Sequence, residues 1–259
     1  MLEDYKIHVE ERLQQGIPPL PLNAEQVSEL VELLKSPPPG EDQSVLDLIT
    51  NRTPAGVDPA AYIKAAFLTD VAKGDASCPL IDRKHATKLL GTMLGGYNVE
   101  SLIKLLEDDE VGSLAADGLS KTLLMFNAKH DVIELAERNI NAKKVVDSWS
   151  NAEWFTNKPK LPDVIKAIVF RVEGEINTDD LSPAPDAPSR PDIPLHALAM
   201  LKKTMEDPLE KIEKLKESNL PIVFVGDVVG TGSSRKSATN SLLWHIGENI
   251  PFIPNKKQA

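Results

Sequence analysis

The apolar residues of this chain follow two different patterns, and the change between them constrains the fold more than any other feature. Up to about residue 156 they recur three and four positions apart, the spacing of a helix that buries one face. After residue 163 they alternate or gather in short runs between loops, as in strands. We therefore expect a helical domain over residues 1–156, a linker over 157–163 and an α/β domain over 164–259.

The helical domain is expected to contain many short helices. In "LNAEQVSELVELLKSPPPG", Asn23 can cap a helix whose apolar positions have helical spacing, and Pro37 stops it. Similar segments continue to "DVIELAERNINAKKVVDSWSNAEWF", and their short linkers imply antiparallel neighbours. Helical pairs of this kind suggest an α-solenoid, although the sequence has no strict repeat. Such a layer usually serves as a scaffold or as a surface for partners.

The polar residues of this region do not form a pattern that looks catalytic. His85 and His130 are isolated and are interpreted as surface histidines. The acidic stretch "EDDE" at residues 107–110 is interpreted as a solvated helix end, because negative charge at a helix C-terminus opposes the macrodipole.

The second region predicts an α/β arrangement whose loops carry the chemistry. The expected strands are "VIKAIVFRVEG" and "LPIVFVGDVV", and the expected helices are "LHALAMLKKTM", "PLEKIEKLKES" and "SATNSLLWHIG". A long irregular segment, "EINTDDLSPAPDAPSRPDIP", follows the first strand.

Composition narrows the class of protein. The net charge of −10 and the pI near 5.1 argue against general binding to nucleic acid or to an anionic membrane, since neutralising phosphates needs a basic face. No apolar run is long enough for a transmembrane helix. The start, "MLEDYKIHVEERLQQ", lacks the apolar core of a signal peptide, so a cytoplasmic protein is expected.

The chain has one cysteine, Cys78. One thiol excludes an internal disulfide, and it excludes a zinc or iron–sulfur site built only from this chain's cysteines. We interpret Cys78 as a small, partly buried residue without a chemical role.

The loop "GTGSSRKS", residues 230–237, lies between the second strand and the last helix. It differs by one residue from the P-loop pattern G-x-x-x-x-G-K-[ST], because Arg235 stands where that pattern needs glycine. Its glycines, hydroxyls and helix N-terminus favour binding of an anion. The guanidinium of Arg235 can bind a carboxylate through two hydrogen bonds. A P-loop, in contrast, needs glycine at this position so that the backbone can curl around the phosphates. The alternative from this loop alone is a serine-capped helix whose arginine makes an ordinary surface pair.

The irregular segment carries a second polar group. Asp179, Asp180, Ser182 and Arg190 lie in a loop that its prolines stiffen. Together the two loops would suit a small polycarboxylate, although Asp179 on its own reads most simply as a turn-forming aspartate.

These long segments resemble one known family. "NTDDLSPAPDAPSRPDIPLHALAMLK" and "GDVVGTGSSRKSATNS" closely resemble bacterial aconitate hydratase B (aconitase 2, also credited with 2-methylisocitrate dehydratase activity). "VELLKSPPPGED", "LLGTMLGGYN" and "AEWF" extend the resemblance over essentially the whole chain. It implies a multidomain fold, in which an all-α HEAT-like superhelical domain precedes an α/β swivel domain that is incomplete in this chain.

The resemblance also implies roles for the loop residues. Ser233, as an alkoxide, would be the base that removes the substrate proton, and Asp179 would support the acid–base network. Arg235 and Arg190 would each hold a substrate carboxylate, and Ser234 would add a contact. The reaction implied is that of a lyase of the tricarboxylic acid cycle, interconverting citrate and isocitrate through cis-aconitate. A [4Fe–4S] cluster would act as Lewis acid on the leaving hydroxyl.

The chain departs from the family in one respect. Family members continue well beyond the equivalent of "IPFIPNKKQA", and the cysteines that ligate the cluster lie in that later part, where Cys78 cannot replace them. We therefore expect an amino-terminal portion that carries site residues but is inactive alone. The alternative is an interaction module, which self-associates through the HEAT-like domain or binds RNA in the cluster-free form, although the net charge does not favour RNA. The choice between citrate and 2-methylcitrate stays open.

Overall fold

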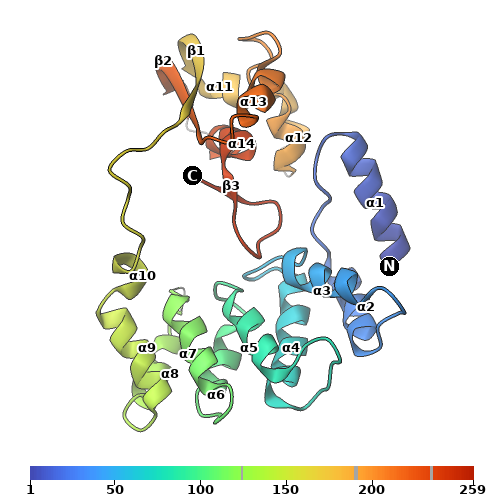
Figure 1. Cartoon of the computed structure of the whole chain (residues 1–259), viewed down its shortest axis with the longest axis vertical. Coiled ribbons are helices and arrows are strands. Elements are labelled where there is room, and N and C mark those ends of the chain that lie inside the picture. The colour runs from blue at the N-terminus through green and yellow to red at the C-terminus, as the bar shows by residue number, and fades with distance from the viewer. Residues whose placement is uncertain (124, 190–191, 234–235) are drawn as a thin grey trace. The chain divides into compact units, whose positions relative to one another are not determined.

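The computed structural model describes residues 1–123, 125–189, 192–233 and 236–259, and Figure 1 shows its elements. They form two compact units. The first contains Leu20–Lys160 together with Met1–Asp4 and Pro251–Pro254. The second contains Leu161–Ile250 together with Tyr5–Pro19 and Asn255–Ala259.

The described part of the first unit is built from helices. They are α2 (Ala24–Lys35), α3 (Asp42–Asn51), α4 (Pro59–Lys73), α5 (Arg83–Gly91), α6 (Val99–Leu105), α7 (Gly112–Lys121), α8 (Ala128–Leu135), α9 (Ile140–Ser150) and α10 (Glu153–Thr156). The predicted succession of short helices is confirmed. Asn23 caps α2 as expected, its side chain accepting a hydrogen bond from the amide of Gln26.

These helices pack in a row. Helix α2 lies against α4, α4 against α5, α5 against α7, and α7 against α9. Helices α3, α6 and α8 lie beside this row, against α2, α7 and α9 respectively. The row buries the apolar faces that the sequence pattern marks, and Leu30, Leu34 and Val27 of α2 are completely buried.

Helices α5 and α7 come unusually close because each has a glycine at the crossing. A Cβ atom on Gly118 would lie 2.9 Å from the Cα of Gly91, and one on Gly91 would lie 3.1 Å from the Cα of Gly118. Neither position has room for a side chain, since the neighbour at that distance is backbone.

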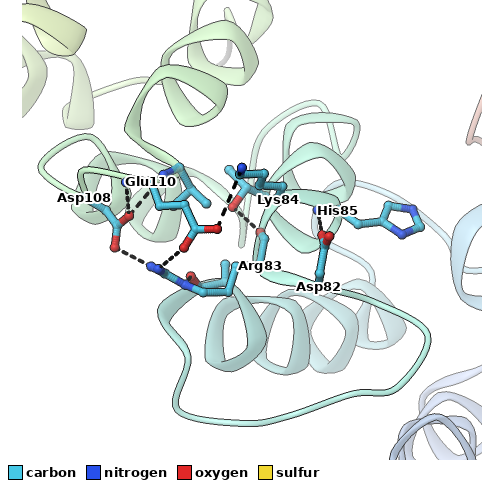
Figure 2. Close-up of polar contacts among 9 residues, drawn as sticks. Asp82, Arg83, Lys84, His85, Asp108 and Glu110 are labelled. Atoms are coloured by element: carbon cyan, nitrogen blue, oxygen red, sulfur yellow. Dashed lines mark hydrogen bonds and ion pairs between the residues drawn. The ribbon is translucent and has the colours of Figure 1, made fainter.

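The acidic stretch at residues 107–110 follows the end of α6, and Glu107, Asp109 and Glu110 are exposed as expected, but the stretch also holds an ion-pair partner that the sequence did not suggest. Figure 2 shows Asp108 and Glu110 directed at the guanidinium of Arg83, which begins α5. The Nη1 of Arg83 donates to Glu110 at 2.6 Å, and its Nε donates to the carbonyl of Ala72 at 2.8 Å. Burial raises the pKa of Asp108, but the amides of Val111 and Glu110 and the Arg83 guanidinium outweigh it and hold that pKa below its usual value.

Cys78 is half-buried, as predicted, and its Sγ donates to the carbonyl of Leu34 at 3.3 Å.

The second unit contains a parallel strand pair with helices. Its elements are α1 (Leu2–Gln14, from Tyr5 on), β1 (Ile168–Asn177), α11 (Thr178–Leu181), the 3-10 helix η1 (Ala184–Ser189), α12 (Ile193–Ala197), α13 (Pro208–Lys216), β2 (Ile222–Thr231), α14 (Lys236–Ile246), β3 (Glu248–Asn249) and β4 (Lys257–Gln258). Strands β1 and β2 run parallel, and β3 pairs with β4 antiparallel. Both long strands and the helices α13 and α14 confirm the prediction.

The helix expected over "LHALAMLKKTM" is shorter than predicted. Helix α12 ends at Ala197, and Leu201 has a positive φ of 60° that no regular helix allows. The turn is held because the amide of Leu201 donates to the carbonyl of Asp180 at 2.7 Å, while its side chain is fully buried beside Phe170 and Ile176. Packing against β1 and α11 outweighs the local helical pattern here.

Helix α1 joins this unit through polar contacts. The Nη2 of Arg12 lies 2.6 Å from the carboxylate of Asp192, and the Arg12 Nε donates to the carbonyl of Pro18. The side chain of Asn255 donates to the carbonyl of Pro19 at 2.8 Å. The Arg12–Asp192 pair is largely buried, so it is far less screened than a surface pair.

The glycine contact predicts a stability effect. Gly118→Ala should lower the free energy of unfolding of the first unit by about 1–3 kcal/mol, because the new Cβ forces α5 and α7 apart despite the better helix propensity of alanine. Urea unfolding followed by circular dichroism measures it. Ser113→Ala, at an exposed position of the same helix, is the control and should change stability by less than about 0.5 kcal/mol. Equal values for the two variants would show that the close contact does not constrain the packing.

His245 of α14 predicts a pH effect on the second unit. Burial lowers the pKa of His245, whose Nε2 lies 3.0 Å from the carbonyl of Ala197. The unfolded chain therefore binds a proton more readily, so stability is full above the ordinary imidazole pKa of about 6.5 and falls as the pH drops below it. His245→Gln can still donate to Ala197 but does not titrate, and its denaturant midpoint should depend less on pH between about 7.5 and 5. His130→Gln, at an exposed site, is the control, and its denaturant midpoint should change with pH as that of the wild type does.

Candidate functional site

The site begins where two parallel strands end. Register pairs Ile168 with Ile222 at the start of β1 and β2, and Asn177 with Thr231 at their end, and Figure 1 shows the two strands side by side. Parallel strands present their carboxyl ends at one edge, which is where open α/β sheets bind ligands. The two polar segments singled out in the sequence, far apart along the chain, therefore leave the sheet as neighbours.

The first segment turns at once into helix α11. The side chain of Asn177 accepts hydrogen bonds from the amides of Asp179 and Asp180, and the Asp180 Oδ2 accepts one from the Asn177 amide at 2.9 Å. This capping box closes the helix N-terminus. The other oxygen of Asp180 accepts from the hydroxyl of Thr204. Both oxygens of Asp180 thus serve the fold, and Asp179 is the carboxylate that the helix turns outward.

The second segment leaves β2 through a glycine turn. Gly232 has a φ of 90°, and a Cβ on it would lie 3.4 Å from the Oγ1 of Thr178. Both the conformation and the close approach favour glycine. The next residue, Ser233, is exposed, and its carbonyl accepts a hydrogen bond from the Thr178 hydroxyl at 2.7 Å. This bond joins the two segments directly.

Not every predicted site residue can be placed. Asp179 and Ser233 are exposed at the ends of the adjacent strands, and the Thr178–Ser233 bond brings their segments together. Arg190, Ser234 and Arg235 lie outside the described residues. The next described residues are Asp192, which pairs with Arg12, and Lys236, which begins α14.

Sequence reasoning missed a cation in the lining of a cavity that Asp179 also lines. Lys203 lines a surface cavity of ≈ 240 Å³ together with Asp179, Asp180 and three residues of the proline-rich loop, Pro183, Ala184 and Pro185. In the sequence, Lys203 is one of two adjacent lysines in a predicted helix, and nothing there distinguishes it. Only the early end of α12 brings it to this cavity.

A buried polar cluster supports the same edge and was also missed. The Ser182 hydroxyl contacts the Nε2 of His196 and lies 2.7 Å from the hydroxyl of Ser237 in the first turn of α14. Ser182 and His196 are completely buried. The sequence named Ser182 as a loop hydroxyl, but it gave no sign that His196, in a helical stretch, would face it.

The chemistry of the site is that of an anion acceptor. The first turn of α14 contributes amides without helical partners and the positive end of the helix dipole. Ser233 adds an exposed residue with a hydroxyl, and Lys203 adds a positive charge to the cavity that Asp179 also lines. A ligand with both carboxylate and hydroxyl groups fits these donors and acceptors.

An iron–sulfur cluster does not fit the residues present. Cysteine thiolates hold such clusters, and the one thiol of this chain donates to the Leu34 carbonyl in the helical unit. Over the described parts of the chain, no three His, Cys, Asp or Glu side chains are grouped so that they could hold a metal ion. Nor is any helix of those parts long and apolar enough to span a bilayer.

Family comparisons agree with these segments. The model described as "Aconitate B N-terminal domain" matches residues 4–155, and the model described as "Aconitate hydratase 2 N-terminus" matches residues 167–259. The chain belongs to the aconitate hydratase B family. The second match spans both strands of the parallel pair, the proline-rich loop and the Ser233 turn, so the site lies within the part that the family shares.

Curated relatives are similar over the whole chain. It is 58% identical to an aconitate hydratase B of Pseudomonas aeruginosa and to one of Synechocystis, and 56% identical to one of Escherichia coli. Each alignment covers 99% of this chain. The chain spans 31%, 30% and 31% of the lengths of these aconitate hydratase B relatives, respectively.

The Thr178–Ser233 bond can be tested in isolation. Thr178→Val keeps the shape of the side chain and removes the donor, so stability should fall by about 1 kcal/mol and the amides of Gly232 and Ser233 should exchange faster with solvent. Hydrogen exchange read by NMR measures this. Thr204→Val removes a hydroxyl whose bond to Asp180 is exposed, and it should leave exchange at Gly232 and Ser233 unchanged. Unchanged exchange in Thr178→Val would mean that the bond does not hold the turn.

Proposed function

We propose that this chain is the part of an aconitate hydratase that binds the substrate and supplies its base. The reaction is the reversible dehydration of citrate to cis-aconitate and its hydration to isocitrate, with 2-methylisocitrate as the alternative substrate. The observation that carries the proposal is the hydrogen bond from Thr178 to Ser233, which unites the two family segments at the carboxyl edge of β1 and β2.

In this proposal Ser233 is the base. As an alkoxide it takes the proton from the carbon next to the one that loses its hydroxyl, and a carbon–carbon double bond forms. An unassisted serine is too weakly acidic for this, so positive charge and amide donors must stabilise the alkoxide. The N-terminus of α14 and the guanidinium of Arg235 are the groups nearest in sequence that can do so.

The remaining roles follow the charges of the substrate. Arg190 and Arg235 each take a carboxylate as a bidentate pair, and Ser234 adds a hydroxyl contact. Asp179 supports the transfer of protons, and its exposed position in a cavity that Lys203 also lines supports this assignment. Asp180 cannot share this role without opening the capping box that begins α11.

The proposed domain division is a HEAT-like domain over residues 1–156, a linker over 157–163 and a partial swivel domain over 164–259. The two family matches, at 4–155 and 167–259, support it. Family membership implies an iron–sulfur cluster in the whole protein. The lone thiol of this chain cannot ligate one, so we expect the chain to be inactive alone.

A chimera tests the proposal. Residues 1–259 would replace the aligned segment of the Pseudomonas aeruginosa relative, to which they are 58% identical. Ser233→Ala in this chimera should lower kcat for isocitrate formation by orders of magnitude, because no other group takes the proton. Ser218→Ala removes an exposed hydroxyl of the same unit and should have no effect.

Two results would contradict the proposal. The first is a Ser233→Ala chimera with near-normal kinetics and an unchanged cluster absorption spectrum. The second is turnover of citrate by the 259-residue chain alone after reconstitution with iron and sulfide.

We do not extend the proposal to RNA or to self-association. A net charge of −10 opposes binding to phosphates, and no contact among the described residues favours either partner.

A further inference from the structure

We infer that Ser182, whose hydroxyl is oriented by His196, is a positioning residue that holds the segment between Ser233 and Ser237 in place. This inference rests on the proposed function of that loop. Two hydrogen bonds join the two ends of helix α11 to Ser233 and Ser237. Thr178, the first residue of α11, bonds the carbonyl of Ser233, and Ser182, which caps the other end of α11, bonds the hydroxyl of Ser237.

The two ties make α11 a brace for the loop. The amide of Ser182 donates to the carbonyl of Thr178 at 3.0 Å, so the distance between the two tie points is fixed by one helical turn. Ser233 and Ser237 bracket the segment that contains the proposed substrate contacts Ser234 and Arg235. Because Thr178 and Ser182 are one helical turn apart, the two bonds limit the separation of Ser233 and Ser237.

His196 sets the direction of the hydrogen bonds. Its Nδ1 lies 3.3 Å from the carbonyl of Asp186, which can only accept, so Nδ1 carries the proton of the neutral ring. The Nε2 is then an acceptor, and the Ser182 hydroxyl donates to it. Ser182 therefore accepts from Ser237, and the hydroxyl proton of Ser237 points into the protein. The order runs from Ser237 to Ser182 to His196 to the Asp186 carbonyl.

This order has a consequence for the loop. Because the hydroxyl proton of Ser237 is donated to Ser182, the Ser237 oxygen can act toward solvent only as a hydrogen-bond acceptor. Ser182 and His196 are both completely buried, so water cannot take over either bond. The cluster thus joins three loops of the site: the Asp179 turn, the proline-rich loop through Asp186, and the start of α14.

The first experiment uses the 259-residue chain and does not depend on catalysis. Ser182→Ala should speed amide exchange at Ser233 and Ser237 by about tenfold or more, since the brace loses one tie, and Ser182→Thr should restore protection. His196→Gln keeps an acceptor at the position of Nε2 and should resemble wild type, whereas His196→Phe should resemble Ser182→Ala. Ser218→Ala is the matched control. Wild-type exchange in both Ser182→Ala and His196→Phe would overturn the inference.

The second experiment reads the positioning role in the chimera. Ser182→Ala should lower kcat about tenfold or more with the cluster spectrum unchanged, and Ser182→Thr should recover most of it, because a misplaced contact residue costs transition-state binding. A lower melting temperature with unchanged kcat and KM would mean that the hydrogen bonds among Ser182, His196 and Ser237 have only a structural role, and it would overturn the inference.

The two proposals fail differently. If Ser233→Ala leaves the chimera active, the proposed function fails whatever Ser182 does. If Ser233→Ala abolishes activity while Ser182→Ala and His196→Phe do not lower kcat, the function stands and the positioning role is wrong.

Discussion

The parallel register of β1 and β2 is the constraint on which the rest of the site depends. Ile168 pairs with Ile222 at the start of the strands and Asn177 with Thr231 at their end, with two register shifts between these pairs, and the residues that follow leave the sheet as neighbours. A shift of one residue would turn each side chain to the opposite face, taking Phe170, Val172 and Ile176 out of the core. The hydrophobic core of the second unit therefore fixes the position of Ser233 relative to Thr178.

The polar residues at this edge divide their work between fold and ligand. Asn177 and Asp180 form the capping box at the N-terminus of α11. Ser182, His196 and Ser237 are joined by hydrogen bonds, and Ser182 and His196 are completely buried. Such buried groups are satisfied within the protein because an unpaired one costs about 1–3 kcal/mol. Asp179, Ser233 and Lys203 differ in being exposed, as the proposed contact with a substrate requires. The adjacent residues Asp179 and Asp180 thus differ, because the capping box engages the carboxylate of Asp180 while Asp179 is exposed.

The helical unit illustrates how far a sequence pattern reaches. Its succession of helices, the Asn23 cap and the half-buried Cys78 follow from spacing, capping chemistry and residue type, and the structure agrees. The role of the acidic stretch did not follow, because its partner Arg83 lies more than twenty residues earlier and only the packing of α5 near the loop before α7 brings them together. The approach of Gly91 to Gly118 was equally hidden, since a glycine in a helical stretch looks like a weakness until the neighbouring helix is in place.

The sequence by itself determined the order of the main helices and strands, the glycine turn after β2, and the two polar segments to which the family resemblance assigns the chemistry. These are local properties, set by periodicity, by backbone freedom at glycine, and by residue types that occur together. The tertiary structure decided which of those residues meet. It joined Thr178 to Ser233, ended α12 early so that Leu201 enters the core, placed Lys203 and Asp179 in the lining of one cavity, and brought His196 into contact with Ser182. Contacts between residues distant in the chain depend on how elements pack, and no local pattern in one sequence records that.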